Sequence, residues 1–252
     1  MKHLTILTGA SRGMGLAMAQ QLCTPDALLL CISRATSSEL QALSTQQGAS
    51  LIQWSADLAE PAPVASQLLA WLGGQDTGSL ASATLINNAG IIGRIGPLNP
   101  MDAVDIATTL RVDLEAPMLL TAAFLTATRA WEVPRKILNI SSGLGRNAMA
   151  GSALYCAAKA GMDHFSRCVA LDEATHTYGA RIVSIAPGVI DTDMQADLRA
   201  GDPAGFPGRA TFINLKETGA LTSPADAAAR LLAYLARPDF GRQPVADVRD
   251  AA

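Results

Sequence analysis

The sequence predicts an α/β fold: one doubly wound parallel sheet of about seven strands, with helices on both faces. Short, nearly continuous apolar runs alternate with longer segments that carry apolar residues at helical spacing. Continuous apolar strands are typical of parallel sheets, because helices cover both faces of such a sheet. No linker interrupts this alternation, and a length of 252 residues suits one domain. We therefore expect a single domain over residues 1–252.

The elements follow one another as strand and helix along the chain. The expected strands are residues 4–8, 27–33, 50–54, 84–87, 136–140, 181–186 and, more weakly, 243–248. The expected helices are residues 14–22, 38–47, 62–72, 101–131, 153–177 and 224–236. Glycine and proline crowd into residues 200–219, which indicates either a lid over a binding site, at about 194–222, or a surface excursion.

Composition excludes several classes of protein. The chain is 49% apolar and 16% charged with a net charge of −3, so it can bury a core and offers no basic surface to nucleic acid or an anionic membrane. Its most apolar stretch, residues 116–130, is too short and too polar to span a bilayer. The four cysteines lack C-x-x-C spacing and the sequence has no leader-like start, which predicts a soluble, cytoplasmic protein. The three histidines are widely scattered, so we expect no metal site.

The first expected strand runs into a glycine-rich turn, Thr8-Gly9-Ala10-Ser11-Arg12-Gly13-Met14-Gly15. Gly9 permits a tight turn, while Gly13 and Gly15 allow the backbone to approach a pyrophosphate at the N-terminus of the next helix. No Gly-Lys-Ser/Thr follows, so this is not a P-loop. The pattern predicts a dinucleotide site; the alternative is an ordinary glycine-rich turn.

The end of the second expected strand indicates which dinucleotide binds. An acidic residue there would bind the ribose 2′-hydroxyl of NAD, but the strand ends in Ser33-Arg34 and no acid follows before Glu39. Arg34, with Arg12 from the glycine turn, can grip a 2′-phosphate through charge-assisted hydrogen bonds. We therefore predict NADP(H); the alternative is that both arginines are solvated surface residues.

Three residues form a candidate catalytic group. Tyr155 and Lys159 stand four apart in an expected helix and so share one face, and Ser142 follows the strand 136–140. A phenol with a pKa near 10 is a weak base, but a neighbouring ammonium and a cationic nicotinamide favour the phenolate. Tyr155 can then exchange a proton with a carbinol oxygen during hydride transfer, while Ser142 orients the carbonyl. Alternatively, Ser142 only satisfies its own backbone.

Taken together, these residues resemble the short-chain dehydrogenase/reductase family, which has a Rossmann-type sheet, from Thr5 to about Val248. The resemblance adds an adenine contact after the third strand, an Asn-Asn-Ala-Gly motif at residues 87–90 and a Pro-Gly motif near the nicotinamide. It implies these cofactor-binding residues: Gly9, Ser11, Arg12, Gly13, Met14, Gly15, Arg34, Asp57, Leu58, Asn88, Ala89, Gly90, Tyr155, Lys159, Pro187, Gly188, Ile190 and Thr192.

The chain departs from the family pattern at two places. In the family, an asparagine behind the lysine holds a water molecule of a proton relay, and this chain has Asp113 at that place. Asp113 can serve the relay if the backbone carbonyl of this residue binds the water, and it alters the relay if the amide donor of the asparagine is needed. The seventh strand lacks the family's glycine-containing signature and reads VADVRD at residues 245–250. We expect Ser142, Tyr155, Lys159 and Asp113 to form the catalytic set.

Within the family, residues 87–97 and 191–195 are similar to the sepiapterin reductase and benzil reductase branch, which reduces vicinal dicarbonyls with NADPH. In that branch a tail aspartate can anchor a pterin, and Asp247 is the nearest match; the alternative is a solvated tail residue. Other expected substrate contacts are Leu144, Met194, Phe206 and Phe212, which either line a pocket under the lid or fasten the loop.

These features predict an NADPH-dependent carbonyl reductase for a small ketone or vicinal dicarbonyl. A 3-oxoacyl-thioester reductase and a non-catalytic NADP-binding sensor on the same fold are the alternatives. The family resemblance also implies a homodimer or homotetramer packed through the helices at 101–131 and 153–177, whose alanines and threonines suit close contact.

Overall fold

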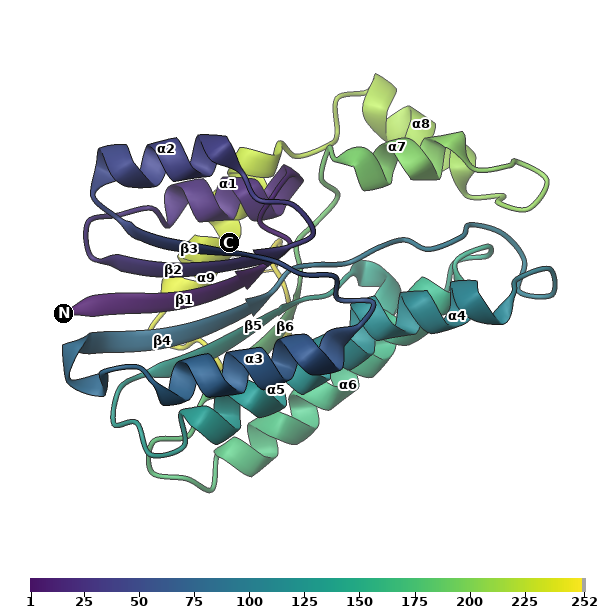
Figure 1. The fold of residues 1–252 in the computed structure, drawn as a ribbon. Helices are drawn as coiled ribbons and strands as arrows, with labels where there is room; N and C mark the ends of the chain where they lie inside the picture. The colour runs from purple at the N-terminus through teal and green to yellow at the C-terminus, as the bar shows by residue number, and fades with distance from the viewer. Residues whose placement is uncertain (251–252) are drawn as a thin grey trace.

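A parallel sheet of seven strands forms the centre of the computed structural model, which describes residues 1–250 (Figure 1). The last two residues of the predicted domain, 251 and 252, lie outside the described part. The spatial order is β3-β2-β1-β4-β5-β6-β7, and every neighbouring pair is parallel, which confirms the predicted fold. The strands are β1 (Lys2–Thr8), β2 (Ala27–Ser33), β3 (Ser50–Ser55), β4 (Leu80–Asn87), β5 (Arg135–Ile140), β6 (Arg181–Ala186) and β7 (Val245–Asp247).

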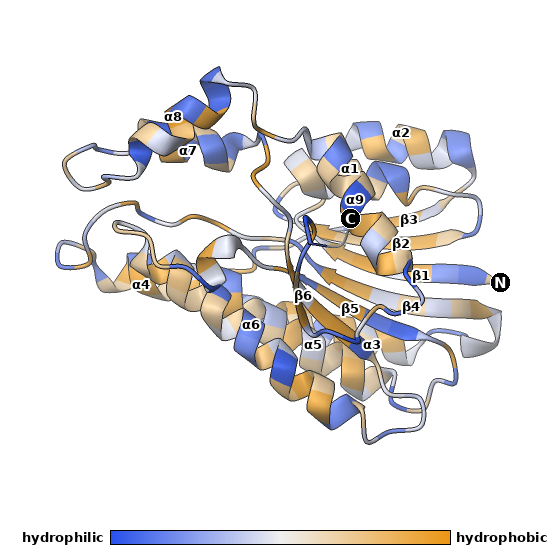
Figure 2. Ribbon diagram, turned by 180° about the vertical axis from the view of Figure 1, so that it is seen from behind, coloured by the Kyte–Doolittle hydropathy of each residue, from blue (hydrophilic) through white to orange (hydrophobic). Residues whose placement is uncertain are grey.

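Helices cover both faces of the sheet, as Figures 1 and 2 show. One layer contains α1 (Gly13–Gln21), α2 (Ser38–Gln47) and α9 (Pro224–Ala236). The other contains α3 (Pro61–Gly73), α5 (Ala116–Ala127) and α6 (Ala153–Glu173). Each layer encloses its own apolar core, because successive strand residues point to opposite faces: Leu7 joins the first core and Ile6 the second, and both are fully buried.

The long helix expected over residues 101–131 is interrupted. It consists of α4 (Ala103–Leu110), one π-helical turn at Arg111–Glu115, and α5. The N–H of Ala116 donates to the carbonyl of Arg111, five residues back. Pro117 explains the change of pattern, because proline has no N–H to donate to the carbonyl of Asp113, four residues earlier. The expectation of one regular helix is therefore wrong, and the wide turn contains Asp113.

The segment rich in glycine and proline is more ordered than expected. Two short helices, α7 (Asp193–Ala200) and α8 (Arg209–Glu217), lie beyond the carboxyl ends of the strands (Figure 1). Much of the expected loop at 200–219 is thus the helix α8. Two exposed ion pairs join this helical pair to the segments beneath it, Arg12 with Asp193 and Lys216 with Asp191, each at 2.6 Å.

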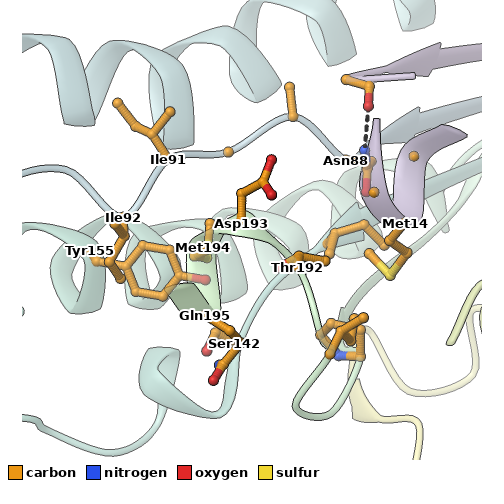
Figure 3. A pocket seen from close by; sticks show the side chains of 18 of the residues that line it. Met14, Asn88, Ile91, Ile92, Ser142, Tyr155, Thr192, Asp193, Met194 and Gln195 are labelled. Atoms are coloured by element: carbon orange, nitrogen blue, oxygen red, sulfur yellow. Dashed lines mark hydrogen bonds between the residues drawn. The ribbon is translucent and has the colours of Figure 1, made fainter. Parts of the chain in front are cut away.

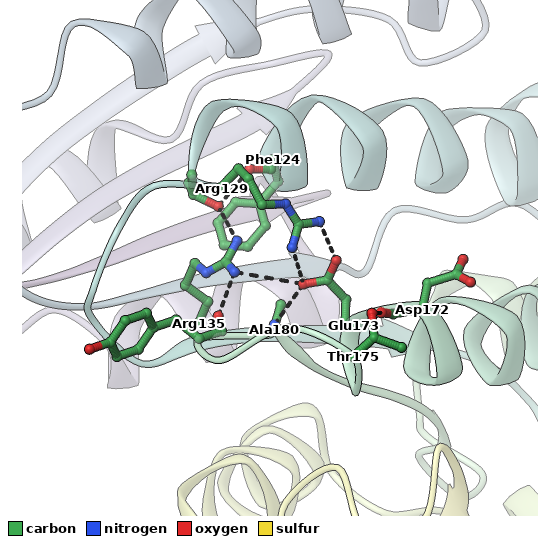
Figure 4. A network of polar contacts seen from close by, with 9 residues as sticks. Phe124, Arg129, Arg135, Asp172, Glu173, Thr175 and Ala180 are labelled. Carbon is green, nitrogen blue, oxygen red and sulfur yellow. Dashed lines mark hydrogen bonds and ion pairs between the residues drawn. The ribbon is translucent and has the colours of Figure 1, made fainter.

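A buried ionic cluster closes the opposite end of the molecule (Figure 4). The carboxylate of Glu173, at the end of α6, accepts hydrogen bonds from both terminal nitrogens of Arg129 and from the N–H of Ala180 at 2.8 Å. The guanidinium of Arg135, at the start of β5, lies 3.6 Å from the same carboxylate and donates to Thr128 Oγ1. The cluster therefore ties α5, β5, α6 and the approach to β6 together.

Within residues 1–250, every helix is too short or too polar to cross a membrane. The same residues contain no group of three or more His, Cys, Asp or Glu side chains arranged to hold a metal ion. The four cysteines are free, with Cys23 and Cys31 buried, Cys156 half-buried and Cys168 exposed.

Candidate active site

A cavity of about 850 Å³ lies at the carboxyl ends of β1 to β6, beneath α7 and α8. The order of strands reverses between β1 and β4, and open α/β sheets bind their ligands at such a switch point. Figure 3 shows part of the cavity, with Met14 and Asn88 toward one end and Ile92 and Tyr155 toward the other.

The residues expected to bind the dinucleotide come together in this cavity. All of them line it: Gly9, Ser11, Arg12, Gly13, Met14, Gly15, Arg34, Asp57, Leu58, Asn88, Ala89, Gly90, Tyr155, Lys159, Pro187, Gly188, Ile190 and Thr192. They come from the ends of β1, β2, β3, β4 and β6 and from α6, so the fold rather than any one motif assembles the set.

The glycine turn is held tightly against the end of β4. Gly9 has a backbone φ of +72°, which residues other than glycine rarely adopt. A Cβ atom added to Gly15 would lie only 2.1 Å from the carbonyl oxygen of Gly9, so this position also requires glycine. Asn88 Nδ2 donates to the carbonyl of Thr8 at 2.9 Å, and the N–H groups of Asn88 and Ala89 donate to Thr8 Oγ1. No side chain caps α1, so the first N–H groups of this helix face the cavity end without a side-chain acceptor within residues 1–250.

The two arginines expected at the 2′-phosphate have different surroundings. Both are exposed at the cavity wall, Arg34 at the end of β2 and Arg12 in the glycine turn. Arg12 Nη1 lies 2.6 Å from Asp193 Oδ2, at the start of α7. An incoming phosphate would therefore compete with Asp193 for Arg12, which leaves Arg34 as the principal candidate for contact with the 2′-phosphate.

Ser142, Tyr155 and Lys159 converge at the far end of the cavity. Ser142 follows β5, and its Oγ accepts from Leu144 N–H at 3.1 Å. Tyr155 and Lys159 lie one turn apart on α6, with Lys159 Nζ 5.5 Å from the centroid of the Tyr155 ring. The Nζ donates to the carbonyl of Ile140 at 3.1 Å, so the end of β5 fixes both the serine and the lysine.

The protein itself disfavours the phenolate of Tyr155. Burial is the largest cause that raises the pKa of Tyr155, and the charge of Asp113 raises it further, while the hydrogen bond with Ser142 lowers it. The ammonium of Lys159 is not among the causes of this shift, so the chain's own residues hold the pKa of Tyr155 above its ordinary value. The protonated phenol is the favoured form, which is the form a proton donor needs.

Asp113 lies behind Lys159, away from the cavity wall. Its side chain is fully buried, with Oδ1 accepting from Ile91 N–H at 2.8 Å and Oδ2 3.8 Å from Lys159 Nζ. Burial is the main cause that raises the pKa of Asp113, and the charge of Lys159 and the hydrogen bond from Ile91 oppose it. Asp113 is therefore placed beside Lys159 and is not among the residues that line the cavity.

The expected substrate contacts divide into two groups. Leu144, Met194 and Phe212 line the cavity near Tyr155, which supports the pocket interpretation for these three. Phe206 is fully buried and lies outside the lining, with its ring stacked on Phe212 at a centroid distance of 5.7 Å. Phe206 as a substrate contact is therefore wrong: it anchors the segment between α7 and α8.

Sequence reasoning missed Gln195 as a site residue. This glutamine lies in the first turn of α7, lines the cavity and is 7% exposed (Figure 3). It belongs to the run at 191–195 that marks the branch resemblance, but a glutamine next to a methionine carries no signal by itself. Only the fold shows that its side chain turns inward.

Asp247 takes no part in the cavity. The carboxylate is 7% exposed and accepts from the N–H, Nε and Nη2 of Arg249, which lower its pKa against the effect of burial. It faces a smaller hollow of about 330 Å³, whereas Arg249 lines the main cavity. Both expectations are thus wrong, since Asp247 is neither a substrate anchor at this cavity nor a solvated tail residue.

The fold and the site together define an oxidoreductase that binds a dinucleotide at the switch point of its sheet. The model of the short chain dehydrogenase family matches residues 3–203, and the chain belongs to that family. As a member it acts on CH–OH and C=O groups with a nicotinamide cofactor.

The relatives agree with the predicted branch. The chain is 36% identical over 235 residues to benzil reductase ((S)-benzoin forming) of Bacillus cereus, covering 93% of this chain and 94% of that one. It is 33% identical over 247 residues to sepiapterin reductase of Rattus norvegicus, covering 93% and 92%. A solved short-chain dehydrogenase/reductase of Burkholderia vietnamiensis is 33% identical with a TM-score of 0.63, covering 99% and 100%. The predicted nearness to the benzil and sepiapterin reductase branch is thus confirmed.

Proposed function

We propose that this chain is an NADPH-dependent carbonyl reductase that reduces a small ketone or vicinal dicarbonyl. The observation that carries the proposal is the convergence of Ser142, Tyr155 and Lys159 on one end of a cavity whose other end is the glycine turn. The similarity to benzil reductase over nearly the whole chain supports a dicarbonyl substrate.

The residues present fit a dinucleotide. Gly15 approaches Gly9 too closely for a side chain at this position. Because the turn is built of glycines here, no side chain covers its backbone, which can therefore contact a pyrophosphate. The helix dipole of α1 and the guanidinium of Arg34 supply positive charge for the phosphates. When bound, the reduced nicotinamide supplies the hydride that adds to the carbonyl carbon.

Side chains of the protein bind the carbonyl oxygen of the substrate and protonate it. The hydroxyl of Ser142 holds this oxygen, and Tyr155, protonated because its pKa is raised, donates a proton as negative charge develops there. Lys159 binds the ribose and restrains Tyr155, and the carbonyl of Ile140 and Asp113 fix the ammonium in place.

Purified protein, benzil and NADPH test the proposal, with NADPH absorbance as the readout. We expect NADPH to be consumed and a hydroxyketone to form. Turnover of a 3-oxoacyl thioester without turnover of benzil would favour a thioester reductase instead. Binding of NADPH without turnover of any carbonyl compound would favour a sensor.

The choice of NADPH over NADH is tested at Arg34. In Arg34→Ala we expect kcat/KM for NADPH to fall by about tenfold to a hundredfold, because one charge-assisted contact with the 2′-phosphate is lost. The value for NADH should stay within about twofold. Arg230→Ala, at an exposed arginine of α9, is the matched control. A wild-type preference for NADH would contradict the cofactor assignment.

The charge of Asp113 is tested through the pH profile of alcohol oxidation, which needs the Tyr155 phenolate. Asp113→Asn removes a negative charge that raises the pKa of Tyr155, so the pKa falls and the rising limb of kcat moves to lower pH. The amide oxygen can still accept from Ile91, which preserves the local structure. An unchanged profile in a folded variant would show that Tyr155 does not sense Asp113.

We also propose a cytoplasmic homodimer or homotetramer that packs through α4, α5 and α6. Large apolar side chains stand exposed along these helices, namely Val104, Met118 and Leu171. Light scattering on the purified chain reports its assembly state.

A further inference from the structure

We propose that Gln195 determines substrate specificity: its carboxamide binds the second oxygen of a vicinal dicarbonyl while Ser142 and Tyr155 bind the first. This inference rests on the proposed function, because it concerns the substrate of the same site. It goes further by naming the group that distinguishes a dicarbonyl from a simple ketone.

The first observation is a side-chain amide that lines the cavity and makes no hydrogen bond with residues 1–250. The side chain of Gln195 is more than nine-tenths buried, and its Oε1 has no hydrogen-bond partner among residues 1–250. Buried polar atoms are nearly always paired, because leaving them unpaired costs free energy. A carbonyl oxygen accepts hydrogen bonds and cannot pair with Oε1, but the amide Nε2 also makes no hydrogen bond among residues 1–250 and can donate to a carbonyl ligand in the cavity that Gln195 lines.

The second observation is the apolar character of the surrounding wall. Met194, Phe212, Leu198 and Ile92 line this end of the cavity and offer a substrate only packing contacts. In such a pocket a single polar group fixes the orientation of the ligand. A carboxamide suits this role, because its nitrogen donates to a carbonyl oxygen and its oxygen accepts from a hydroxyl.

The position of Gln195 in the cavity indicates that the substrate oxygen it binds lies near the oxygen of the carbonyl that is reduced. Gln195, Ser142 and Tyr155 all line the cavity, and Met194, the neighbour of Gln195 in the chain, packs in the same apolar cluster as Tyr155 (Figure 3). In the proposed reaction Ser142 and Tyr155 both contact the reacting oxygen, and both line the cavity. The carboxamide is therefore available to a second oxygen close to the reacting one, as on the adjacent carbon of a 1,2-diketone.

A purely structural use of the amide is the competing explanation. Arg199 lies one turn further along α7, and its Nη1 is also buried without a partner among residues 1–250. If the amide served to pair with Arg199, its loss would lower the stability of α7 and leave substrate preference unchanged. The two explanations thus predict different measurements.

The test compares benzil with 1,2-diphenylethanone, which lacks one of the two oxygens. For Gln195→Leu we expect kcat/KM for benzil to fall by about three- to tenfold, the loss of one neutral hydrogen bond, with the value for 1,2-diphenylethanone within twofold. The ratio of the two values should fall accordingly. Gln46→Leu, at an exposed glutamine of α2, is the matched control and should keep the wild-type ratio.

Gln195→Glu keeps the length of the side chain but loses the N–H donors, so it should lower the same ratio even if the leucine variant does not fold. An unchanged ratio in a folded variant, with benzil still reduced by the wild type, overturns the inference alone. A KM for NADPH raised equally with both substrates also overturns it, because the amide would then serve the cofactor. A wild type that reduces neither compound contradicts the proposed function, and the inference with it.

Discussion

Tyr155→Phe is expected to lower the kcat of carbonyl reduction by a factor of about 100 to 10,000, the usual contribution of a general acid. The phenylalanine ring keeps the packing of this buried position but cannot donate a proton to the developing alkoxide. The Kd for NADPH should stay within about twofold, because the glycine turn and Arg34 supply the phosphate contacts. Single-turnover kinetics and fluorescence titration with NADPH give the two quantities.

Tyr178→Phe is the matched control for that substitution. Tyr178 is 51% exposed and lies in the connection between α6 and β6, far from the cavity lining. Its variant should reduce the substrate at the wild-type rate. Undiminished turnover in Tyr155→Phe would remove Tyr155 from the mechanism.

Glu173→Ala is expected to lower the free energy of unfolding by about 3–5 kcal/mol, the usual result of breaking a buried ion pair on one side. Arg135, whose side chain is 1% exposed, would remain buried without its anionic partner, and the N–H of Ala180 would lose its acceptor. Urea denaturation measures the change. Asp172→Ala, at the exposed neighbouring carboxylate, should stay within about 0.5 kcal/mol of the wild type.

The same cluster predicts how stability depends on pH. Burial acts to raise the pKa of Glu173, but the hydrogen bonds from Arg129 and Ala180 and the charges of Arg129 and Arg135 outweigh it and lower the pKa. Glu173 therefore contributes stability above its unfolded pKa of about 4.3, and this is lost as the pH falls through the lower folded value. The stability difference between wild type and Glu173→Gln should shrink over that range.

Much of the fold follows from local patterns. Apolar runs such as 27–33 predict strands because a parallel sheet buries both faces, and β2 has those bounds. The spacing of Tyr155 and Lys159 placed both on one helix face, and the structure has them on one turn of α6. These predictions depend only on periodicities of a few residues, which the sequence displays directly.

The features that the sequence did not predict depend on contacts between segments that are distant in the chain. Nothing near Arg12 indicates Asp193 as a partner, since 181 positions separate them. Phe206 and Phe212 are the same type of residue six positions apart, yet only Phe212 lines the cavity. The inward turn of Gln195 likewise follows from the seating of α7 on the rest of the fold.

The cavity is lined by residues from Gly9 to Arg249, contributed by the ends of β1 to β6, by α6 and by both helices above them. No shorter stretch of the chain contains all of these residues, so a dinucleotide bound there binds and stabilises only the completely folded domain. By mass action, a free cofactor concentration a thousand times its Kd adds about 4 kcal/mol to the stability of the entire domain. Cellular supply of the dinucleotide would then govern the lifetime of this chain against proteolysis as well as its rate of catalysis.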